Sequence, residues 1–363
     1  MKPLRVSCVV GARPNFIKMA PLMAELAQRP RWTAQLIHTG QHYSAEMSDQ
    51  FFEDLEMPRP NVHLGLAGGT PTQQTANILL ALEPVFNEFQ PDVLIVVGDV
   101  TSTLAASLAA ARLGIKVAHV EAGLRSNDRT MPEEINRILT DSLSEFLFTS
   151  EPSGERNLLA EGVAASRIFF VGNVMIDTLL KFRAKAAQSR VLERLGIEEN
   201  SYAVATLHRP ANVDDPARLA ALLRVLNQVA ERLPVIFPLH PRTEKKIVEL
   251  GLDLGKIQTC PPQGYLDFLR MMSAARILLT DSGGIQEETT ILGVPCLTLR
   301  ENTERPVTIE QGTNRLIGLD PKRIHDAVIE TLDSGFRSGG RLPEKWDGKA
   351  SGRIFDVLET RLA

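Results

Sequence analysis

The sequence predicts an α/β protein built from two Rossmann-like domains, each with a parallel sheet, and a cleft between them. Three observations support this fold class. The chain has 363 residues, too many for one ordinary core. Short apolar runs alternate with helical patterns, and polar loops follow the apolar runs. The alternation restarts near Gly172, which predicts one domain at residues 1–171 and a second at residues 172–349.

The composition limits the classes of function. The chain is 44% hydrophobic and 23% charged with a formal net charge of −4, and its Lys and Arg residues are scattered, so no basic surface for nucleic acid is expected. No apolar stretch approaches the length that spans a membrane, and the run at residues 6–10 is too short for a signal peptide. Cys8, Cys260 and Cys296 lie far apart in apolar runs, which indicates reduced core thiols and a cytoplasmic protein.

Six apolar runs in the first half are predicted strands, at residues 4–10, 34–38, 91–97, 117–120, 146–149 and 168–171. The run at 91–97 is almost unbroken, as expected for a parallel strand buried on both faces. Helical patterns follow at residues 16–26, at 104–113 and from 131 onward. The loop after the first strand contains no GxGxxG sequence, so the dinucleotide fingerprint is absent.

Charged residues follow several of these strands. Arg13 and Lys18 flank the start of the first helix, where cations could meet an anionic ligand. Arg and Lys residues at a helix end are, however, more often simply exposed to solvent. Asp99 and Glu121 follow the strands at 91–97 and 117–120. Because ligands of open α/β sheets lie beyond the carboxyl ends of the strands, these two acids are expected to converge. Glu133 opens a later helix beside a second acid, and helix capping explains at least one of the two.

The second half repeats the pattern. Strands are predicted at residues 202–207, 235–237, 258–260, 277–280 and 294–299, and helices at 174–194, 219–232, 266–272, 285–292 and 353–362. His208 follows the first of these strands and His240 the second, and an Arg comes soon after each. A lone histidine is usually structural, but two in consecutive βα units are candidate functional residues.

The segment TDSGGIQEE at residues 280–288 connects a buried strand to a helix through Ser282, Gly283 and Gly284. This geometry directs free backbone N–H groups and the helix dipole at an anion. An ordinary βα turn with a Ser or Asp N-cap is an equally good interpretation of this segment alone. Glu287 and Glu288 are expected in the first helical turn, where one of them could point sideways and accept ribose hydroxyls. With such an acid, the segment would be a seat for a nucleoside diphosphate, and the rest of the chain must decide between the two interpretations.

Ten segments in order resemble the non-hydrolysing UDP-N-acetylglucosamine 2-epimerases: GARPNFIK (11–18), TGQH (39–42), GDVTSTLA (98–105), HVEAGLRS (119–126), MPEEINR (131–137), VGNVMIDTLL (171–180), LHRPAN (207–212), LHPR (239–242), TDSGGIQEE (280–288) and NTERP (302–306). The resemblance covers most of the chain. It implies the GT-B architecture, a homodimer, and a C-terminal helix at residues 350–363 that packs back on the N-terminal domain. It also implies reversible conversion of UDP-GlcNAc to UDP-ManNAc for surface polysaccharide synthesis.

The implied chemistry is anti-elimination of UDP across C1–C2, which gives an enzyme-bound 2-acetamidoglucal, followed by re-addition. The residues that match the catalytic positions of the family are Asp99, Glu121, Glu133 and His208. Those that match its substrate-binding positions are Arg13, Lys18, Gln263, Phe268, Ser282, Gly283, Gly284, Glu288 and Arg305. The resemblance implies no metal and no nicotinamide cofactor, because the reaction is a deprotonation and not an oxidation.

The chain departs from the usual family pattern at Asn15, Met131 and Val307. It also resembles the branch that epimerises UDP-2,3-diacetamido-2,3-dideoxyglucuronate, so two sugars remain candidates. Bacterial members use a second UDP-GlcNAc as an activator, and Gln41, Arg209 and His240 match part of that allosteric site. The alternatives are a hydrolysing epimerase, a GT-B glycosyltransferase and a non-catalytic nucleotide-sugar-binding protein.

Overall fold

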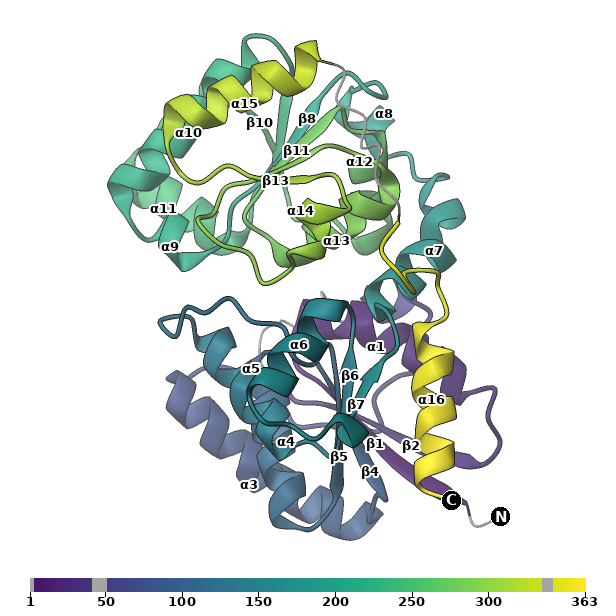
Figure 1. The fold of residues 1–363 in the computed structure, drawn as a ribbon. Helices are drawn as coiled ribbons and strands as arrows, with labels where there is room; N and C mark the ends of the chain where they lie inside the picture. Colours follow the sequence, from purple (N-terminus) through teal and green to yellow (C-terminus); the bar gives the residue numbers. More distant parts are fainter. Residues whose placement is uncertain (1–2, 41–50, 335–341) are drawn as a thin grey trace. The chain divides into compact units, whose positions relative to one another are not determined.

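The computed structural model describes residues 3–40, 51–334 and 342–363. The chain is an α/β protein with two parallel sheets, as predicted, and it divides into two compact units (Figure 1). Unit 1 contains residues 1–181 and 344–363, and unit 2 contains residues 182–343. The division lies inside helix α7, Val174–Ala186, whereas the sequence analysis placed it before this helix.

Unit 1 contains a seven-stranded sheet with the order β3-β2-β1-β4-β5-β6-β7, in which all neighbouring strands are parallel. Its strands are β1 Leu4–Val10, β2 Trp32–His38, β3 Val62–His63, β4 Val93–Val97, β5 Lys116–Val120, β6 Phe146–Thr149 and β7 Ile168–Phe170. Its helices are α1 Arg13–Leu26, α3 Pro71–Phe89, α4 Thr101–Arg112, α5 Pro132–Leu143, α6 Pro152–Ala160, the 3-10 helix η1 Ala165–Arg167, most of α7 and α16 Ala350–Arg361.

Strand β4 explains why the sheet of unit 1 is covered on both faces. All five of its residues, VLIVV, are buried, which requires helices on each side of the sheet. On one side, Ile78, Leu82 and Phe86 of α3 pack in the same apolar cluster as the small side chains of α4. The alanines of α4 lack bulk, so this helix can pack closely between the sheet and its neighbours.

Unit 2 contains a six-stranded parallel sheet with the order β10-β9-β8-β11-β12-β13. Its strands are β8 Ala203–Thr206, β9 Val235–Pro238, β10 Gln258–Cys260, β11 Ile277–Thr280, β12 Cys296–Thr298 and β13 Asn314–Leu316. Its helices, after the last residues of α7, are α8 Val191–Leu195, α9 Pro210–Val213, α10 Pro216–Ala230, α11 Pro241–Leu250, α12 Tyr265–Ala274, α13 Gly283–Leu292, α14 Val307–Glu310 and α15 Pro321–Asp333.

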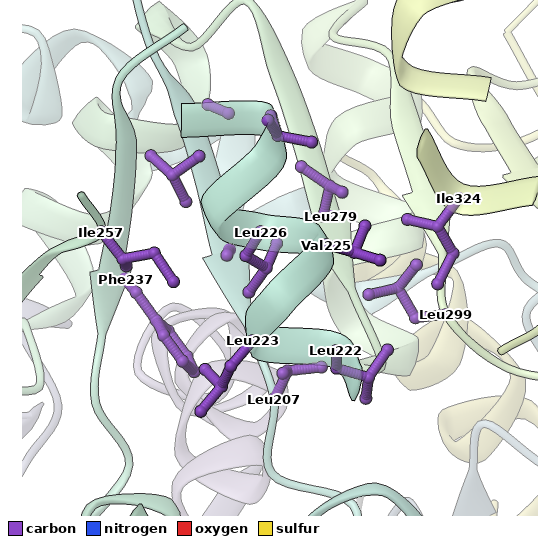
Figure 2. Packing of buried hydrophobic residues seen from close by; sticks show 14 of the residues in the cluster. Leu207, Leu222, Leu223, Val225, Leu226, Phe237, Ile257, Leu279, Leu299 and Ile324 are labelled. Atoms are coloured by element: carbon purple, nitrogen blue, oxygen red, sulfur yellow. The ribbon is translucent and has the colours of Figure 1, made fainter. Parts of the chain in front are cut away.

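The core of unit 2 lies between its sheet and α10. Figure 2 shows Leu222, Leu223 and Leu226 of this helix pointing into a cluster with residues of the strands and of α15. The apolar residues of α10 recur at the helical period, so one face of the helix is buried while its polar residues stay outside.

The two sheets share one topological feature that positions polar residues. In each sheet the strand order reverses between the first strand of the unit and the fourth, that is, between β1 and β4 in unit 1 and between β8 and β11 in unit 2. Ligands of doubly wound sheets bind at the carboxyl ends of the strands beside such a switch point. The loops after these four strands are therefore the candidate functional loops.

Helix α16 belongs to unit 1, although it is the last element of the chain. The carboxylate of Asp177 accepts hydrogen bonds from the N–H groups of Ala350 (3.1 Å) and Ser351 (2.8 Å) at the start of this helix. Farther along, Asp356 contacts Arg29 at 2.7 Å, and Phe355 packs edge-on against Trp32. Within the ranges given above, the structure has no helix long and apolar enough to cross a membrane.

Candidate active site

The loop after β1 in unit 1 is held by Asn15, one of the departures from the family pattern. Its side-chain oxygen accepts hydrogen bonds from the N–H groups of Gly11 (3.1 Å) and Ala12 (3.2 Å). Its amide nitrogen donates to the carbonyl of Val97 at the end of β4 (2.9 Å). Asn15 therefore ties together the two loops at the switch point of unit 1. Arg13 opens α1 beside this loop, with its guanidinium 4.8 Å from the ring centre of Phe51.

Lys18, one turn into α1, forms a buried ion pair with Glu121. Its Nζ lies 2.5 Å from Oε2 of Glu121, and both side chains are at least 95% buried. The ammonium group also lies beside Gly98, where a Cβ would be 3.1 Å from Nζ. Lys18 thus connects the loop after β1 with the ends of β4 and β5.

Glu121 has a strained backbone. Its φ of 74° lies in the left-handed region, which costs roughly 1–3 kcal/mol for a residue other than glycine and persists only where surrounding contacts impose it. Two such contacts come from β6, since the N–H groups of Glu121 and Ala122 both donate to the carbonyl of Phe148 at 3.0 Å. The backbone at the end of β5 is therefore constrained in a conformation that aims this carboxylate at Lys18.

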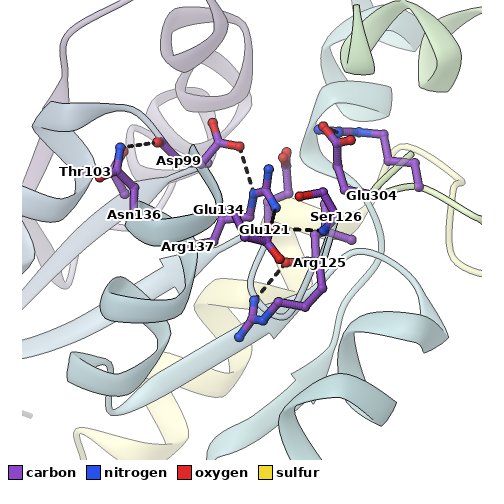
Figure 3. A network of polar contacts seen from close by, with 12 residues as sticks. Asp99, Thr103, Glu121, Arg125, Ser126, Glu134, Asn136, Arg137 and Glu304 are labelled. Atoms are coloured by element: carbon purple, nitrogen blue, oxygen red, sulfur yellow. Dashed lines mark hydrogen bonds and ion pairs between the residues drawn. The ribbon is translucent and has the colours of Figure 1, made fainter. Parts of the chain in front are cut away.

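Asp99 follows β4 and is held by helix α5. Arg137 Nε lies 3.0 Å from Asp99 Oδ2, and the Asn136 side chain donates to the carbonyl of Asp99 at 2.8 Å. Arg137 is buried and also bonds to Glu134 (Figure 3). The Asp99 carboxylate stays partly accessible, with 22% of its side chain exposed. The network leaves an oriented carboxylate at the end of β4.

The two acids at the start of α5 have different environments. Glu134 is 1% exposed and accepts hydrogen bonds from the backbone N–H groups of Ser126 (3.0 Å) and Asn127 (2.9 Å), so it fixes the loop after β5. Glu133 is only partly buried. Both acids lie in the first turn of α5, where negative charge suits the helix dipole, and the hydrogen bonds of Glu134 to the preceding loop give it a second structural role. The catalytic role of Glu133 stays a prediction.

In unit 2, His208 lies after β8 and is held by the buried carboxylate of Asp281. His208 Nδ1 lies 2.8 Å from Asp281 Oδ1, and the imidazole side chain is 40% exposed. Asp281 also accepts hydrogen bonds from the N–H groups of His208 (3.0 Å) and Arg209 (2.9 Å) and from the Asn212 side chain (3.1 Å). Burial opposes ionisation of Asp281, but His208 and the backbone donors outweigh it and hold the pKa of Asp281 below its usual range. The carboxylate orients the histidine by Nδ1 and leaves Nε2 for chemistry.

Helix α13 begins with the Ser-Gly-Gly turn of the sequence analysis. Ser282 is the N-cap of this helix, as the ordinary-turn interpretation predicts, although its side chain makes no capping hydrogen bond. Gly284 is partly exposed and Gly283 is buried. A Cβ on Gly283 would lie 2.5 Å from Nη1 of Arg305, so a larger residue there would displace this guanidinium.

The sequence analysis placed Glu287 and Glu288 in the wrong turn of this helix. Because α13 begins at Gly283, Glu287 and Glu288 lie in its second turn and not in its first. Glu287 Oε2 is 2.9 Å from Arg305 Nε, so its charge is compensated. Glu288 is 5% exposed and accepts a hydrogen bond of 3.2 Å from the hydroxyl of Tyr265, which orients its carboxylate.

Three arginines surround Glu304 beside the start of α13. The guanidinium groups of Arg300, Arg305 and Arg209 lie 2.8, 2.8 and 3.4 Å from its carboxylate. With Glu287, the cluster contains three cations and two anions, a local excess of positive charge. Burial lowers the pKa of Arg300 from its ordinary value, and the neighbouring arginines add to this effect against the attraction of Glu304. The cluster favours an anion at this helix N-terminus.

The remaining candidate residues have separate positions. Gln263 and Phe268 are partly buried before and within α12, and the Gln263 amide donates to the carbonyl of Pro261 at 2.6 Å. Among the residues that match the allosteric site, His240 accepts a hydrogen bond at Nδ1 from the N–H of Arg242 (3.2 Å) at the start of α11. Its ring centre lies 6.2 Å from that of His208. Gln41 lies outside the described residues.

The structure thus gathers the candidates into two groups. Unit 1 brings together Lys18 and Glu121 and supports Asp99 through Arg137. Unit 2 brings together His208, the turn before α13 and Arg305. The sequence analysis missed the residues that hold these groups, namely His119, Glu134, Arg137, Asp141, Asp281, Arg300 and Glu304. Five of them lie inside the quoted segments, and their charge in otherwise apolar or helical surroundings was the available signal.

Two Rossmann-like domains with parallel sheets form the GT-B architecture of nucleotide-sugar enzymes. The sequence model of the UDP-N-acetylglucosamine 2-epimerase family matches residues 24–359. The chain therefore belongs to this family.

Individual relatives agree with this assignment. The UDP-N-acetylglucosamine 2-epimerase of Methanocaldococcus jannaschii is 42% identical over 98% of the chain and 99% of that protein. The UDP-2,3-diacetamido-2,3-dideoxy-D-glucuronate 2-epimerase of Pseudomonas aeruginosa is 39% identical over 98% of the chain and 99% of that protein. The crystal structure of the M. jannaschii enzyme in complex with UDP-GlcNAc and UDP superposes with a TM-score of 0.93 over 98% of this chain and 100% of that one.

Proposed function

We propose that this enzyme interconverts UDP-GlcNAc and UDP-ManNAc by epimerisation at C2. One observation carries the proposal beyond family membership. Two carboxylates, Asp99 and Glu121, follow neighbouring parallel strands, and each is held by a buried cation. Such a pair suits a reaction in which a proton leaves one face of a carbon and returns to the other.

The proposed reaction has two balanced steps. A base removes the proton at C2, the C1–O bond breaks, and UDP leaves with the bonding electrons, which gives 2-acetamidoglucal. UDP then adds back to C1 while an acid delivers a proton to the opposite face of C2. Asp99, Glu121, Glu133 and His208 are the proposed acid–base groups. Neither step requires a metal or a nicotinamide.

Unit 2 is proposed to bind the nucleotide. The N–H groups of Ser282, Gly283 and Gly284, with Arg305, would bind the diphosphate. Arg13 and Lys18 of unit 1 stay proposed substrate-binding residues. The buried carboxylate of Glu288 would accept the ribose hydroxyls, and Gln263 and Phe268 would contact the uracil. The positive cluster around Glu304 supports this assignment, since charge builds up on the leaving diphosphate.

The second candidate substrate is UDP-2,3-diacetamido-2,3-dideoxyglucuronate. The observation that favours it is the Pseudomonas aeruginosa relative, which is nearly as similar to this chain as the M. jannaschii enzyme. Both substrates would react by the same elimination and re-addition, so the proposed roles of the residues do not depend on the choice.

The test is incubation of the purified protein with each nucleotide sugar in deuterated water, followed by proton NMR. Deuterium at C2 of both epimers, with UDP still attached, is the expected result. Free N-acetylmannosamine would identify a hydrolysing epimerase instead. Retention of the C2 hydrogen in both nucleotide sugars, despite binding of UDP, would overturn the proposal. Turnover without an acceptor sugar would exclude a glycosyltransferase.

We also propose that the enzyme is a cytoplasmic homodimer, and that it feeds surface polysaccharide synthesis. Its three cysteines are buried and unpaired, as reduced thiols are. Leu80 on α3 is 71% exposed, and Ile135 and Leu139 on α5 are 45% and 44% exposed, which supports an association surface on these helices. Light scattering of the purified protein would measure the mass, and a monomer at micromolar concentration would overturn the dimer.

A further inference from the structure

His119, in strand β5, is a buried histidine that the proposed chemistry does not use. Its side chain is fully buried, and both ring nitrogens face oxygen atoms. Nδ1 lies 2.6 Å from Asp141 Oδ1, and Nε2 lies 2.8 Å from the carbonyl oxygen of Gly98. Gly98 directly precedes Asp99, so the ring joins β5 to the turn that carries this proposed catalytic acid.

The contacts of the His119 ring show which of its nitrogens donate hydrogen bonds. The carbonyl of Gly98 can only accept, so Nε2 must carry a proton. Asp141 also accepts from the N–H of Gly123 (3.1 Å) and pairs with Arg125 Nη1 (2.7 Å), as an ionised carboxylate does. Nδ1 then faces this carboxylate as a hydrogen-bond donor. Both ring nitrogens of His119 therefore donate, one to Gly98 and the other to Asp141.

Asp141 contacts the chain on both sides of Glu121. Its Oδ1 holds the side chain of His119, two residues before Glu121, and its Oδ2 holds the N–H of Gly123, two residues after it. The segment between these points contains the strained φ of Glu121. A Cβ on Gly123 would clash with the backbone of Gly154, so the chain cannot relax by moving toward α6.

We propose that His119 and Asp141 are a positioning pair that fixes the ends of β4 and β5, and thereby the separation and direction of the carboxylates of Asp99 and Glu121. The side chain of His119 is hydrogen-bonded to Gly98, the residue before Asp99. It is also hydrogen-bonded to Asp141, whose carboxylate contacts residues on both sides of Glu121. This inference rests on the proposed catalytic roles of Asp99 and Glu121. The pair does not touch the substrate and acts through these two acids.

Two substitutions of His119 separate its two bonds. In His119→Gln, the amide nitrogen can replace Nε2 and donate to Gly98, whereas in His119→Asn it can replace Nδ1 and donate to Asp141. Because the bond to Gly98 reaches Asp99, His119→Asn is expected to lower kcat by roughly 10–100-fold, the usual effect of losing a supporting residue, with KM changed less than about 2-fold. His119→Gln is expected to retain more of kcat. Asp141→Asn, which weakens the grip on Glu121, is expected to resemble His119→Asn.

Asp177→Asn is the matched control. Asp177 is another buried carboxylate of unit 1 that accepts backbone N–H groups, but it holds α16. Its substitution is expected to lower the melting temperature and leave kcat unchanged at temperatures where the protein is folded. Wild-type kcat in folded His119→Asn and Asp141→Asn, as in the control, would overturn the inference and leave the proposed function intact. A wild-type protein without turnover would overturn the proposed function and the positioning role together.

A measurement on the wild-type protein tests the inference even where the variants do not fold. Nitrogen-15 NMR of histidine-labelled protein is expected to show both ring nitrogens of His119 as protonated donors at neutral pH, including one hydrogen bond to a carbonyl. The chain contains seven histidines, so the signal can be assigned with the His119→Gln variant or by through-space contacts. A neutral ring with one N–H would overturn the inference.

Discussion

The two units each contain a histidine held by a buried aspartate, and the two pairs differ in the exposure of the histidine. In unit 1, His119 Nδ1 lies 2.6 Å from Asp141, and in unit 2, His208 Nδ1 lies 2.8 Å from Asp281. Both aspartates are buried. His119 has no exposed surface and uses both ring nitrogens, whereas 40% of the His208 side chain is exposed. The same pair of side chains therefore fixes a backbone in one unit and presents a ring nitrogen in the other.

The difference follows from where each histidine lies relative to the sheet. His119 is inside strand β5, with its side chain directed at the neighbouring strand end of β4. His208 lies two residues beyond the end of β8, at the switch point of its sheet. A histidine within a strand of a doubly covered sheet is enclosed by helices, and one just beyond the strand can reach a ligand. Position along the strand thus separates the proposed positioning histidine from the proposed catalytic one.

The largest effect is expected at the acids that the first pair positions. Asp99→Asn and Glu121→Gln each remove an acid–base group, so kcat should fall by at least about 10³-fold, within the range that such groups contribute. Because the nucleotide is assigned to unit 2, the Kd for UDP should change little. Steady-state kinetics and calorimetry with UDP would measure the two quantities. Full activity in either variant would remove that carboxylate from the mechanism.

A smaller loss is expected when the second pair is broken. Asp281→Asn removes the anion that orients His208, and it also weakens the hydrogen bonds to the backbone N–H groups of His208 and Arg209. We expect kcat to fall about 10²-fold, as for other supporting residues. Asp214→Asn is a suitable control, because Asp214 forms an exposed ion pair with Arg242 in the same unit. If Asp281→Asn and its control have equal kcat values, His208 needs no orienting partner and the comparison fails.

The pH dependence of stability should reveal the charge of both aspartates. Burial opposes ionisation of Asp141, but His119 and Arg125 outweigh it and lower its pKa, and the pKa of Asp281 is lowered in the same way. A lowered pKa in the folded state means that the carboxylate stabilises the fold above the unfolded-state pKa of about 3.9. This stability is lost as the pH falls from about 5 through that value toward the folded-state pKa.

Urea unfolding at a series of pH values between about 6 and 3 would measure this loss. Asp141→Asn and Asp281→Asn should each flatten the acid limb of the stability curve. Asp177 should change the stability in the opposite direction. Burial raises its pKa, and this effect outweighs the hydrogen bonds from residues 350 and 351, which lower it. Its protonation favours the folded state as the pH falls, so Asp177→Asn should make the acid loss steeper. The same slope in all three variants would contradict the assigned charges.

The fold was largely predictable, because apolar runs such as VLIVV of β4 reveal buried parallel strands directly. The residues at the strand ends were predictable too, since Asp99, Glu121 and His208 follow such runs. The residues that hold these side chains in place could not be predicted. Asp141 lies 18 residues after Gly123 and 22 after His119, and only the pairing of β5 with its neighbours and the packing of α5 bring these residues together. Local periodicity has no information on such long-range contacts.

The smallest effect is expected at a hydrogen bond of unit 1 that is separate from both pairs. Trp32 Nε1 donates to Glu359 Oε1 of helix α16 at 2.8 Å. Trp32→Phe keeps an aromatic ring against Phe355 but removes this donor, which should reduce the free energy of unfolding by about 0.5–1.5 kcal/mol. Thermal unfolding and kinetics would measure the change, and kcat should remain at the wild-type value. A loss of kcat comparable to that of His119→Asn would mean that any weakening of unit 1 disturbs Asp99 and Glu121, and the specific role of the His119–Asp141 pair would then be lost.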